Sequence, residues 1–154
     1  MLNKKYEALK NYLIENGHAT AEELTEKISA VYDESYGTFG IIGNEYKVLT
    51  DEEADEAAAD YIKESLWAFN PEFILQHSTA SEKTTARENE EIIKALRMVQ
   101  ESICEGANAL VKALISDIDA FIDDAIDADG RGHSLSSWDG EEHESKNFFI
   151  YRTN

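Results

Sequence analysis

Acidic side chains recur at every fourth position in two segments of this chain. Residues four apart lie on the same face of an α-helix, so a helical segment would place its carboxylates in one line. With a rise of about 1.5 Å per residue, successive carboxylates would be about 6 Å apart, the same scale as the phosphates of a nucleic-acid strand. The first row contains Glu52, Glu56, Asp60 and Glu64, and the second row contains Asp119, Asp123 and Asp127.

Two interpretations of these rows compete. Like charges four residues apart destabilise a helix by roughly 0.2–0.5 kcal/mol per pair, about 1–2.5 kcal/mol for the five pairs together, which a function could compensate. That function would be imitation of the charge pattern of DNA, with the rows occupying the basic groove of a nucleic-acid enzyme. The plain and commoner alternative is a solvated helix face, since acids in a first helical turn are also favoured by the helix dipole.

Carboxylates and histidines crowd a glycine turn later in the chain, a composition that suggests a cation site. An EF-hand is excluded, because with Asp127 in its first position Arg131 and Trp138 would stand where oxygen ligands are required. No tight ligand motif supports another metal site, so a metal-binding protein or hydrolase is the alternative function. Its candidate residues are Asp123, Asp127, Asp129, His133 and His143.

The commonest catalytic motifs are absent from the sequence. There is no G-x-S-x-G, no phosphate-binding glycine loop, no H-E-x-x-H and no paired C-x-x-C. The single cysteine, Cys104, follows Ile103 in an apolar helical pattern, which favours a buried packing role over a nucleophile. The sequence therefore predicts no catalytic residue and no cofactor, and it favours a protein that is not an enzyme.

The charge of the chain narrows the choice of partner. Thirty-two acidic residues against 14 basic ones leave a formal charge of −18 in 154 residues. Such a charge repels nucleic acids and anionic membranes, and it attracts basic protein surfaces. With one cysteine, no secretory signal and no apolar stretch long enough to span a bilayer, we expect a cytoplasmic protein whose partner has a basic surface.

Helical periodicity surrounds the carboxylate rows. Leu2 to Leu13 predicts a first helix, and capping boxes at Thr20 and Thr50 predict the starts of two more, the second helix continuing through Ile28 and Val31. Asn70-Pro71 ends the third helix, because proline disfavours helix at the preceding residue. Further helices are expected around Ile92–Ile103 and from Ser116 to Ala128. The aromatic residues Trp67, Phe69 and Phe73 are interpreted as core.

Two β-hairpins complete the expected fold. The first contains residues 36–42 and 45–49 around Gly43-Asn44, and the second contains residues 133–138 and 148–151 with a turn at Asp139-Gly140. The prediction is an α+β fold in which about five helices pack against a small antiparallel sheet built from the two hairpins. Residues 1–154 are expected to form a single domain, with a variable N-terminal helical extension at 1–35 and the core at 36–154.

Four segments resemble a group of small acidic proteins encoded by bacteriophages and plasmids: VLTDEEADEAA, ESLWAFNPEF, ADGRGHSLSSWDGEEHE and FFIYRTN. The resemblance extends from about Tyr36 to the last residue, and Ser134 and Trp138 depart from it, where an aromatic residue and a tyrosine are expected. The group has no established activity, so no site residue follows from the resemblance. What it implies is a phage-borne accessory protein, of a class that often binds host machinery such as defence nucleases.

Charge, carboxylate rows and resemblance together give the functional hypothesis. The chain is expected to be a phage-type accessory protein in the host cytoplasm that binds a basic surface of a host protein. In its sharpest form, it is a DNA mimic that inhibits a defence nuclease, as anti-CRISPR or anti-restriction proteins do. The partner-binding residues would be those of the two carboxylate rows.

Overall fold

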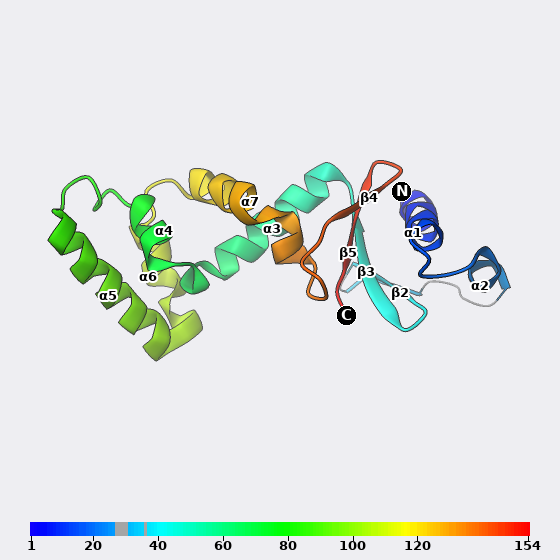
Figure 1. Cartoon of the computed structure of the whole chain (residues 1–154), viewed down its shortest axis with the longest axis horizontal. Helices are drawn as coiled ribbons and strands as arrows, with labels where there is room; N and C mark the ends of the chain where they lie inside the picture. Colours follow the sequence, from blue (N-terminus) through cyan, green and yellow to red (C-terminus); the bar gives the residue numbers. More distant parts are fainter. Residues whose placement is uncertain (27–30, 36) are drawn as a thin grey trace. The chain divides into compact units, whose positions relative to one another are not determined.

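The computed structural model describes residues 1–26, 31–35 and 37–154, and it divides into two compact units (Figure 1). Unit 1 contains residues 1–58 and 129–154, and unit 2 contains residues 59–128. All the described strands belong to unit 1, whereas both units contain helices, and this confirms the predicted α+β class. Each unit has its own hydrophobic core, a subdivision that length and composition do not indicate.

The elements have the following bounds. The α-helices are α1 (Leu2–Glu15), α2 (Ala21–Glu26), α3 (Asp51–Glu64), α4 (Pro71–Gln76), α5 (Ala86–Ile103), α6 (Asn108–Leu114) and α7 (Ile118–Leu135). Short 3-10 helices are η1 (Leu66–Ala68) and η2 (Cys104–Ala107). The strands are β1 (Val31–Asp33), β2 (Thr38–Ile41), β3 (Asn44–Leu49), β4 (His143–Ser145) and β5 (Phe148–Arg152).

The five strands form one antiparallel sheet in the order β1-β2-β3-β5-β4. The first predicted hairpin is confirmed as β2 and β3, with the turn at Ile42-Gly43 instead of Gly43-Asn44. Both turn residues have positive φ, 50° and 75°, as a two-residue turn with the twist of the strands requires. Strand β1 was not predicted: Val31 pairs with β2 instead of continuing a helix, and Ile28 lies outside the described residues.

The second predicted hairpin is wrong in its first strand. His133 to Leu135 are helical, in the part of α7 that follows a break in the helix at Gly130, and the strand that pairs with β5 is β4, joined to it by Lys146-Asn147. The Asp139-Gly140 signal does mark a turn, but the Asp139 carboxylate closes it locally by accepting from the Ser136 hydroxyl (2.6 Å) and the Glu141 N–H (3.0 Å). Such side-chain turns reverse the chain without requiring strands on either side.

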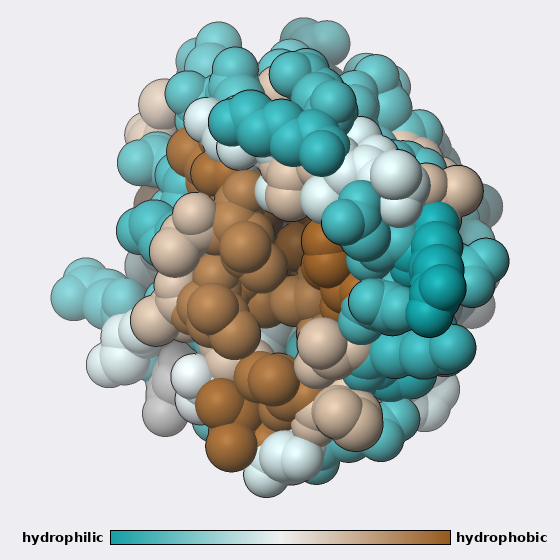
Figure 2. All heavy atoms as spheres, turned by 90° about the vertical axis from the view of Figure 1, so that its left-hand side faces the viewer, coloured by the Kyte–Doolittle hydropathy of each residue, from teal (hydrophilic) through white to brown (hydrophobic). Residues whose placement is uncertain are grey.

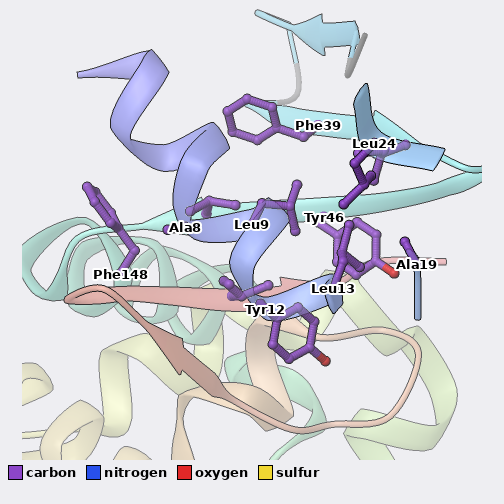
Figure 3. Packing of buried hydrophobic residues seen from close by; sticks show 12 residues of the cluster. Ala8, Leu9, Tyr12, Leu13, Ala19, Leu24, Phe39, Tyr46 and Phe148 are labelled. Carbon is purple, nitrogen blue, oxygen red and sulfur yellow. The ribbon is translucent and has the colours of Figure 1, made fainter. Parts of the chain in front are cut away.

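Helix α1 supplies much of the core of unit 1 (Figure 3). Leu9 and Leu13 are buried between the helix and the sheet, where they meet Phe39, Val48 and Ile150. Burying each such side chain contributes roughly 1.5–3 kcal/mol. The segment that the sequence suggests is an extension, residues 1–35, therefore contains a helix on which this core depends.

The regular elements of unit 2 are all helices, and aromatic rings form the centre of its core. Phe121 is fully buried, with its ring 5.0 Å from that of Phe69 and 4.8 Å from that of Phe73. The Gln100 amide of α5 donates to the carbonyls of Trp67 (2.7 Å) and Phe69 (2.8 Å), which ties α5 to η1. Of the three aromatic residues expected in the core, Phe69 and Phe73 are half-buried and pack against it, whereas Trp67 is half-buried and is not part of this cluster.

Candidate protein-binding surface

The predicted capping box fixes the first turn of α3. The Thr50 N–H donates to the Glu53 carboxylate (2.8 Å), and the Glu53 N–H donates to the Thr50 hydroxyl (3.2 Å). The buried face of the helix carries Ala54, Ala58 and Ile62 at steps of four. A helix with one buried face turns its other faces to solvent, and the first carboxylate row lies there.

Lys5 of α1 pairs with Glu53 at 2.5 Å and so connects α1 to the start of α3. Burial alone raises the pKa of Glu53, but the hydrogen bonds from Lys5 and from the Thr50 N–H outweigh it, and the pKa lies below its ordinary value. A lowered folded pKa contributes stability above the unfolded pKa, and this contribution is lost as pH falls through the folded value.

We therefore expect acid to destabilise the wild type more than a Glu53→Gln variant. Glutamine keeps the capping geometry and removes only the ionisable group. The difference in acid sensitivity between the two proteins therefore measures the contribution of the Glu53 charge to stability. The measurement is the urea midpoint at about pH 7 and about pH 3. Glu52→Gln is the matched control, because among the described residues Glu52 has no ion pair, and it should follow the wild type. Equal acid sensitivity of all three proteins would contradict the assignment.

All four acids of the first row are exposed on α3. Glu52 and Glu56 belong to unit 1, and Asp60 and Glu64 belong to unit 2. Asp60 lies 3.9 Å from the Lys63 ammonium, a long and exposed pair of little energetic weight. Within the described part of the chain, no basic side chain lies within 4.0 Å of the other three. The row is therefore open to a partner's cations.

The second row occupies α7 within unit 2. Phe121, Ile122 and Ala125 of this helix are buried, and Asp119, Asp123 and Asp127 are all exposed. The helix begins one residue later than Ser116 would dictate, since the Asp117 carboxylate accepts from the N–H groups of Asp119 and Ala120 (both 3.1 Å). Among the described residues, no lysine, arginine or histidine lies within 4.0 Å of any acid of this row; on α7 within unit 2, Asp124 has such a neighbour, with its carboxylate 3.4 Å from Nε2 of His77.

Both units are acidic on their own. Unit 1 contains 18 acidic and 8 basic residues, a formal charge of −10, and unit 2 contains 14 acidic and 6 basic residues, a formal charge of −8. The negative field is thus a property of each unit and does not depend on how they are arranged. A basic partner would be attracted to either one.

Arg131 is the residue around which the acids of unit 1 converge, and sequence reasoning missed it. Its Nη1 donates to the Asp51 and Asp55 carboxylates, both at 2.8 Å, while Nε and Nη2 donate to the two oxygens of Glu142 at 2.8 and 3.0 Å. Its guanidinium lies 4.3 Å from the centre of the Phe149 ring. We call these three carboxylates, the guanidinium and the ring the Arg131 cluster.

The electrostatics of the Arg131 cluster follow from this geometry. The hydrogen bonds to Glu142 raise the pKa of Arg131 despite its burial, so the guanidinium is charged at every accessible pH. Burial, assisted by the hydrogen bond that the Tyr151 hydroxyl donates to Glu142, raises the pKa of Tyr151. Arg131 thus neutralises acids next to the first carboxylate row and makes no ion pair with the row itself.

The residues of the metal alternative do not form a metal site. Asp123 and Asp127 lie in unit 2, whereas Asp129, His133 and His143 lie in unit 1. Among the described residues there is no group of three or more His, Cys, Asp or Glu side chains that could hold a metal ion. The Nε2 atom of His143 instead lies 3.6 Å from Asp139, and its ring lies 5.0 Å from that of Tyr12. Arg131, which lies in the same stretch of sequence, binds none of these five residues; its carboxylate partners are Asp51, Asp55 and Glu142.

Cys104 is exposed, so the expected buried packing role is wrong. Its φ of 46° lies outside the helical range, and the residue stands between the end of α5 and the start of η2, so it does not continue the periodicity of α5. The heptad-like pattern through Ile103 could not reveal this, because a change of helix type leaves no mark on hydrophobic spacing.

Comparison of the chain with protein-family models, curated proteins and solved structures gave no match. Among the helices of the described residues, none is long and apolar enough to cross a membrane. A functional conclusion therefore rests on the arrangement of side chains.

Proposed function

We propose that this protein binds a basic surface of another protein through its two carboxylate rows, and that it does so as a mimic of DNA. The observation that carries the proposal is that all seven row acids are exposed, and that only Asp60 has a basic neighbour among the described residues. Basic grooves of nucleic-acid enzymes are built to bind lines of negative charge. A helix with carboxylates about 6 Å apart offers them such a line.

The biological setting we propose is a bacteriophage accessory protein acting in the host cytoplasm. Its target would be a host enzyme that acts on nucleic acid, such as a defence nuclease. Association would be fast and strongly dependent on salt, because the attraction acts between exposed charges and is screened over about 10 Å at 0.1 M salt. The resemblance to small acidic phage and plasmid proteins supports this setting.

An affinity capture from bacterial lysate tests the proposal. The variant to compare is Glu52→Gln, Glu56→Gln, Asp60→Asn and Glu64→Gln together, which removes the first row. Four surface pairs at roughly 0.2–1 kcal/mol each contribute about 1–4 kcal/mol, so recovery of the target should fall at least about fivefold. Competition with duplex DNA and a rise to about 0.5 M salt should each release the target from the wild type.

A charge-matched control variant separates the effect of the first carboxylate row from the effect of the protein's net charge. Glu45, Glu82, Glu90 and Glu105 are exposed, lie outside both rows and have no ion pair among the described residues. Their replacement by glutamine removes the same number of negative charges and should leave recovery nearly unchanged. Equal losses in both variants, or capture that resists DNA and salt, would show that the rows are only solvated helix faces.

A further inference from the structure

Unit 2 is not acidic over its whole surface. Figure 2 views the molecule from the α5 side and shows a face on which apolar residues gather around a hollow, with polar residues around them. The charge of the unit as a whole therefore does not decide what each part of it binds. The local groups decide it.

A groove within unit 2 combines aromatic rings with charged side chains. Its volume is about 490 Å³, inside the range of about 300–1,000 Å³ that is usual for small-molecule sites. All its lining residues belong to unit 2, so the groove lies within one compact unit. Its walls include Trp67, Phe69 and Pro71 from the segment of η1 and the start of α4, and Arg97, Glu101 and Cys104 from α5 and η2.

The aromatic part of the groove is held in place by α5. Trp67 and Phe69 are half-buried, and Pro71 is buried. The side-chain amide of Gln100 donates to the main-chain carbonyls of Trp67 (2.7 Å) and Phe69 (2.8 Å). These two hydrogen bonds fix the main chain that carries the rings. A wall of this kind favours a ligand with a flat apolar group.

Two opposite charges of α5 line the same groove. Arg97 and Glu101 are four residues apart, the spacing at which helix side chains are neighbours, yet no ion pair joins them. Among the described residues, the carboxylate within 4.0 Å of Arg97 is that of Glu72, at 3.4 Å, and both side chains are about half exposed. In the same part of the chain, no basic side chain lies within 4.0 Å of Glu101. The groove thus offers a guanidinium and a carboxylate to a ligand.

The balance of charge decides between possible ligands. The lining residues carry one positive and one negative formal charge, so the groove is neutral although unit 2 has a formal charge of −8. The unit repels a polyanion, and the groove has no excess of acid to attract a basic segment. A pure hydrocarbon would cover both charged groups without pairing either. A zwitterion that carries a ring matches the rings and both charges.

We propose that this groove binds an aromatic amino acid, or a small molecule with the same three groups: a flat ring, a carboxylate and an ammonium. The ring packs against Trp67 and Phe69. The carboxylate accepts hydrogen bonds from Arg97, and the ammonium donates to Glu101. The site goes beyond the proposed function, because no residue of either carboxylate row lines it.

The test is a titration of the full chain with four probes. L-Phenylalanine has all three groups, 3-phenylpropionate lacks the ammonium, 2-phenylethylamine lacks the carboxylate, and L-alanine lacks the ring. Fluorescence of Trp67 reports binding in a Trp138→Phe background, since the chain has two tryptophans. Phenylalanine should bind about three- to fivefold more tightly than either singly charged probe, the upper range for a solvent-accessible ion pair, and alanine should not bind measurably. Equal affinity for the three ring-containing probes would overturn the inference.

Charge variants assign each contact. Arg97→Gln should remove the advantage of phenylalanine over 2-phenylethylamine and keep its advantage over 3-phenylpropionate, because only the carboxylate contact is lost. Glu101→Gln should do the reverse. Glu90→Gln and Lys94→Gln are the matched controls, since this pair has opposite charges at the same spacing on α5 but does not line the groove, and both should bind every probe like the wild type. If Arg97→Gln and Glu101→Gln leave the preference for phenylalanine unchanged, the proposal is wrong.

Cys104 locates the bound ligand. It is the single cysteine of the chain, it is exposed and it lines the groove, so its alkylation by iodoacetamide reports on this place alone. Saturating phenylalanine should slow the alkylation at least about threefold, and alanine should not. Binding without protection of Cys104 would place the ligand elsewhere and overturn the inference. Protection that rises with protein concentration, together with a dimer in light scattering, would assign the groove to a second copy and overturn it as well.

Discussion

Replacement of Arg131 by methionine is expected to lower the free energy of unfolding by about 2–4 kcal/mol. The arginine side chain is only 11% exposed and makes ion pairs with Asp51, Asp55 and Glu142. Methionine keeps most of the buried volume but leaves three carboxylates close together without a cation. The cost is smaller than for a fully buried pair, because Asp51 and Asp55 are about two-thirds exposed and water screens them.

Urea denaturation of Arg131→Met and Arg131→Lys measures this effect. Lysine keeps the charge but cannot make the two parallel bonds to Glu142 that the planar guanidinium makes, so an intermediate loss is expected. Arg87→Met is the matched control: Arg87 is 87% exposed, with one pair to Glu91 at 3.3 Å, and should cost at most about 0.5 kcal/mol. Equal losses for Arg131→Met and Arg87→Met would show that the Arg131 cluster contributes no more than an ordinary surface pair.

The elements that the sequence predicts well are those whose cause is local. Both capping boxes, at Thr20 and Thr50, are present, because their hydrogen bonds join residues three apart. The exposure of the carboxylate rows also follows from period alone: the buried residues of α3 recur at Ala54, Ala58 and Ile62, which leaves the acids on other faces. The regular geometry of the α-helix is enough to explain both the capping boxes and the exposure of the rows.

The features that the sequence did not predict depend on distant partners. Arg131 meets Asp51 and Asp55 from 80 and 76 positions away, and no local pattern indicates those pairs. Strand β4 has little β-forming character, yet it pairs with β5 while its neighbour Glu142 binds Arg131. Lys146-Asn147 is also a weaker turn signal than Asp139-Gly140, so local reasoning chose the wrong turn for the hairpin.

The candidate surface shows the same difference between features set by local sequence and features set by tertiary packing. The charged rows could be found by counting positions, whereas the exposure of Ile103 and Leu110 could not. Ile103 and Leu110 have the spacing of core residues, and only packing decides that they stay exposed. Hydrophobic periodicity indicates which residues share a helix face but not whether the protein itself covers that face.

Gly132→Ala is expected to cost at least about 3 kcal/mol, as much as any single substitution outside the core. A Cβ atom at Gly132 would overlap the Gly140 carbonyl oxygen and lie 2.7 Å from the Glu141 carbonyl carbon and 2.8 Å from the Glu142 nitrogen. All of these are backbone atoms, so no side-chain rotation can relieve the overlap. The loop would have to move away from α7, carrying Glu142 away from Arg131.

Two other glycines provide control substitutions that lack the steric overlap of Gly132. Gly130 has φ 75° and ψ 160°, a backbone conformation adopted almost only by glycine, but nothing lies within 4 Å of an added Cβ, so Gly130→Ala should cost about 1–3 kcal/mol from backbone strain alone. Gly106 has ordinary space, with Ile103 3.5 Å away, and Gly106→Ala should be neutral or stabilise by up to about 1 kcal/mol. Thermal and urea unfolding should therefore rank Gly132, Gly130 and Gly106 in decreasing order of cost.

The double variant tests whether Gly132 and the Arg131 cluster act together. Because the loss of stability in Gly132→Ala includes the Arg131–Glu142 hydrogen bonds, combining it with Arg131→Met should cost less than the sum of the two single changes. Full additivity would mean that the close approach of the loop and the Arg131 cluster stabilise unit 1 independently.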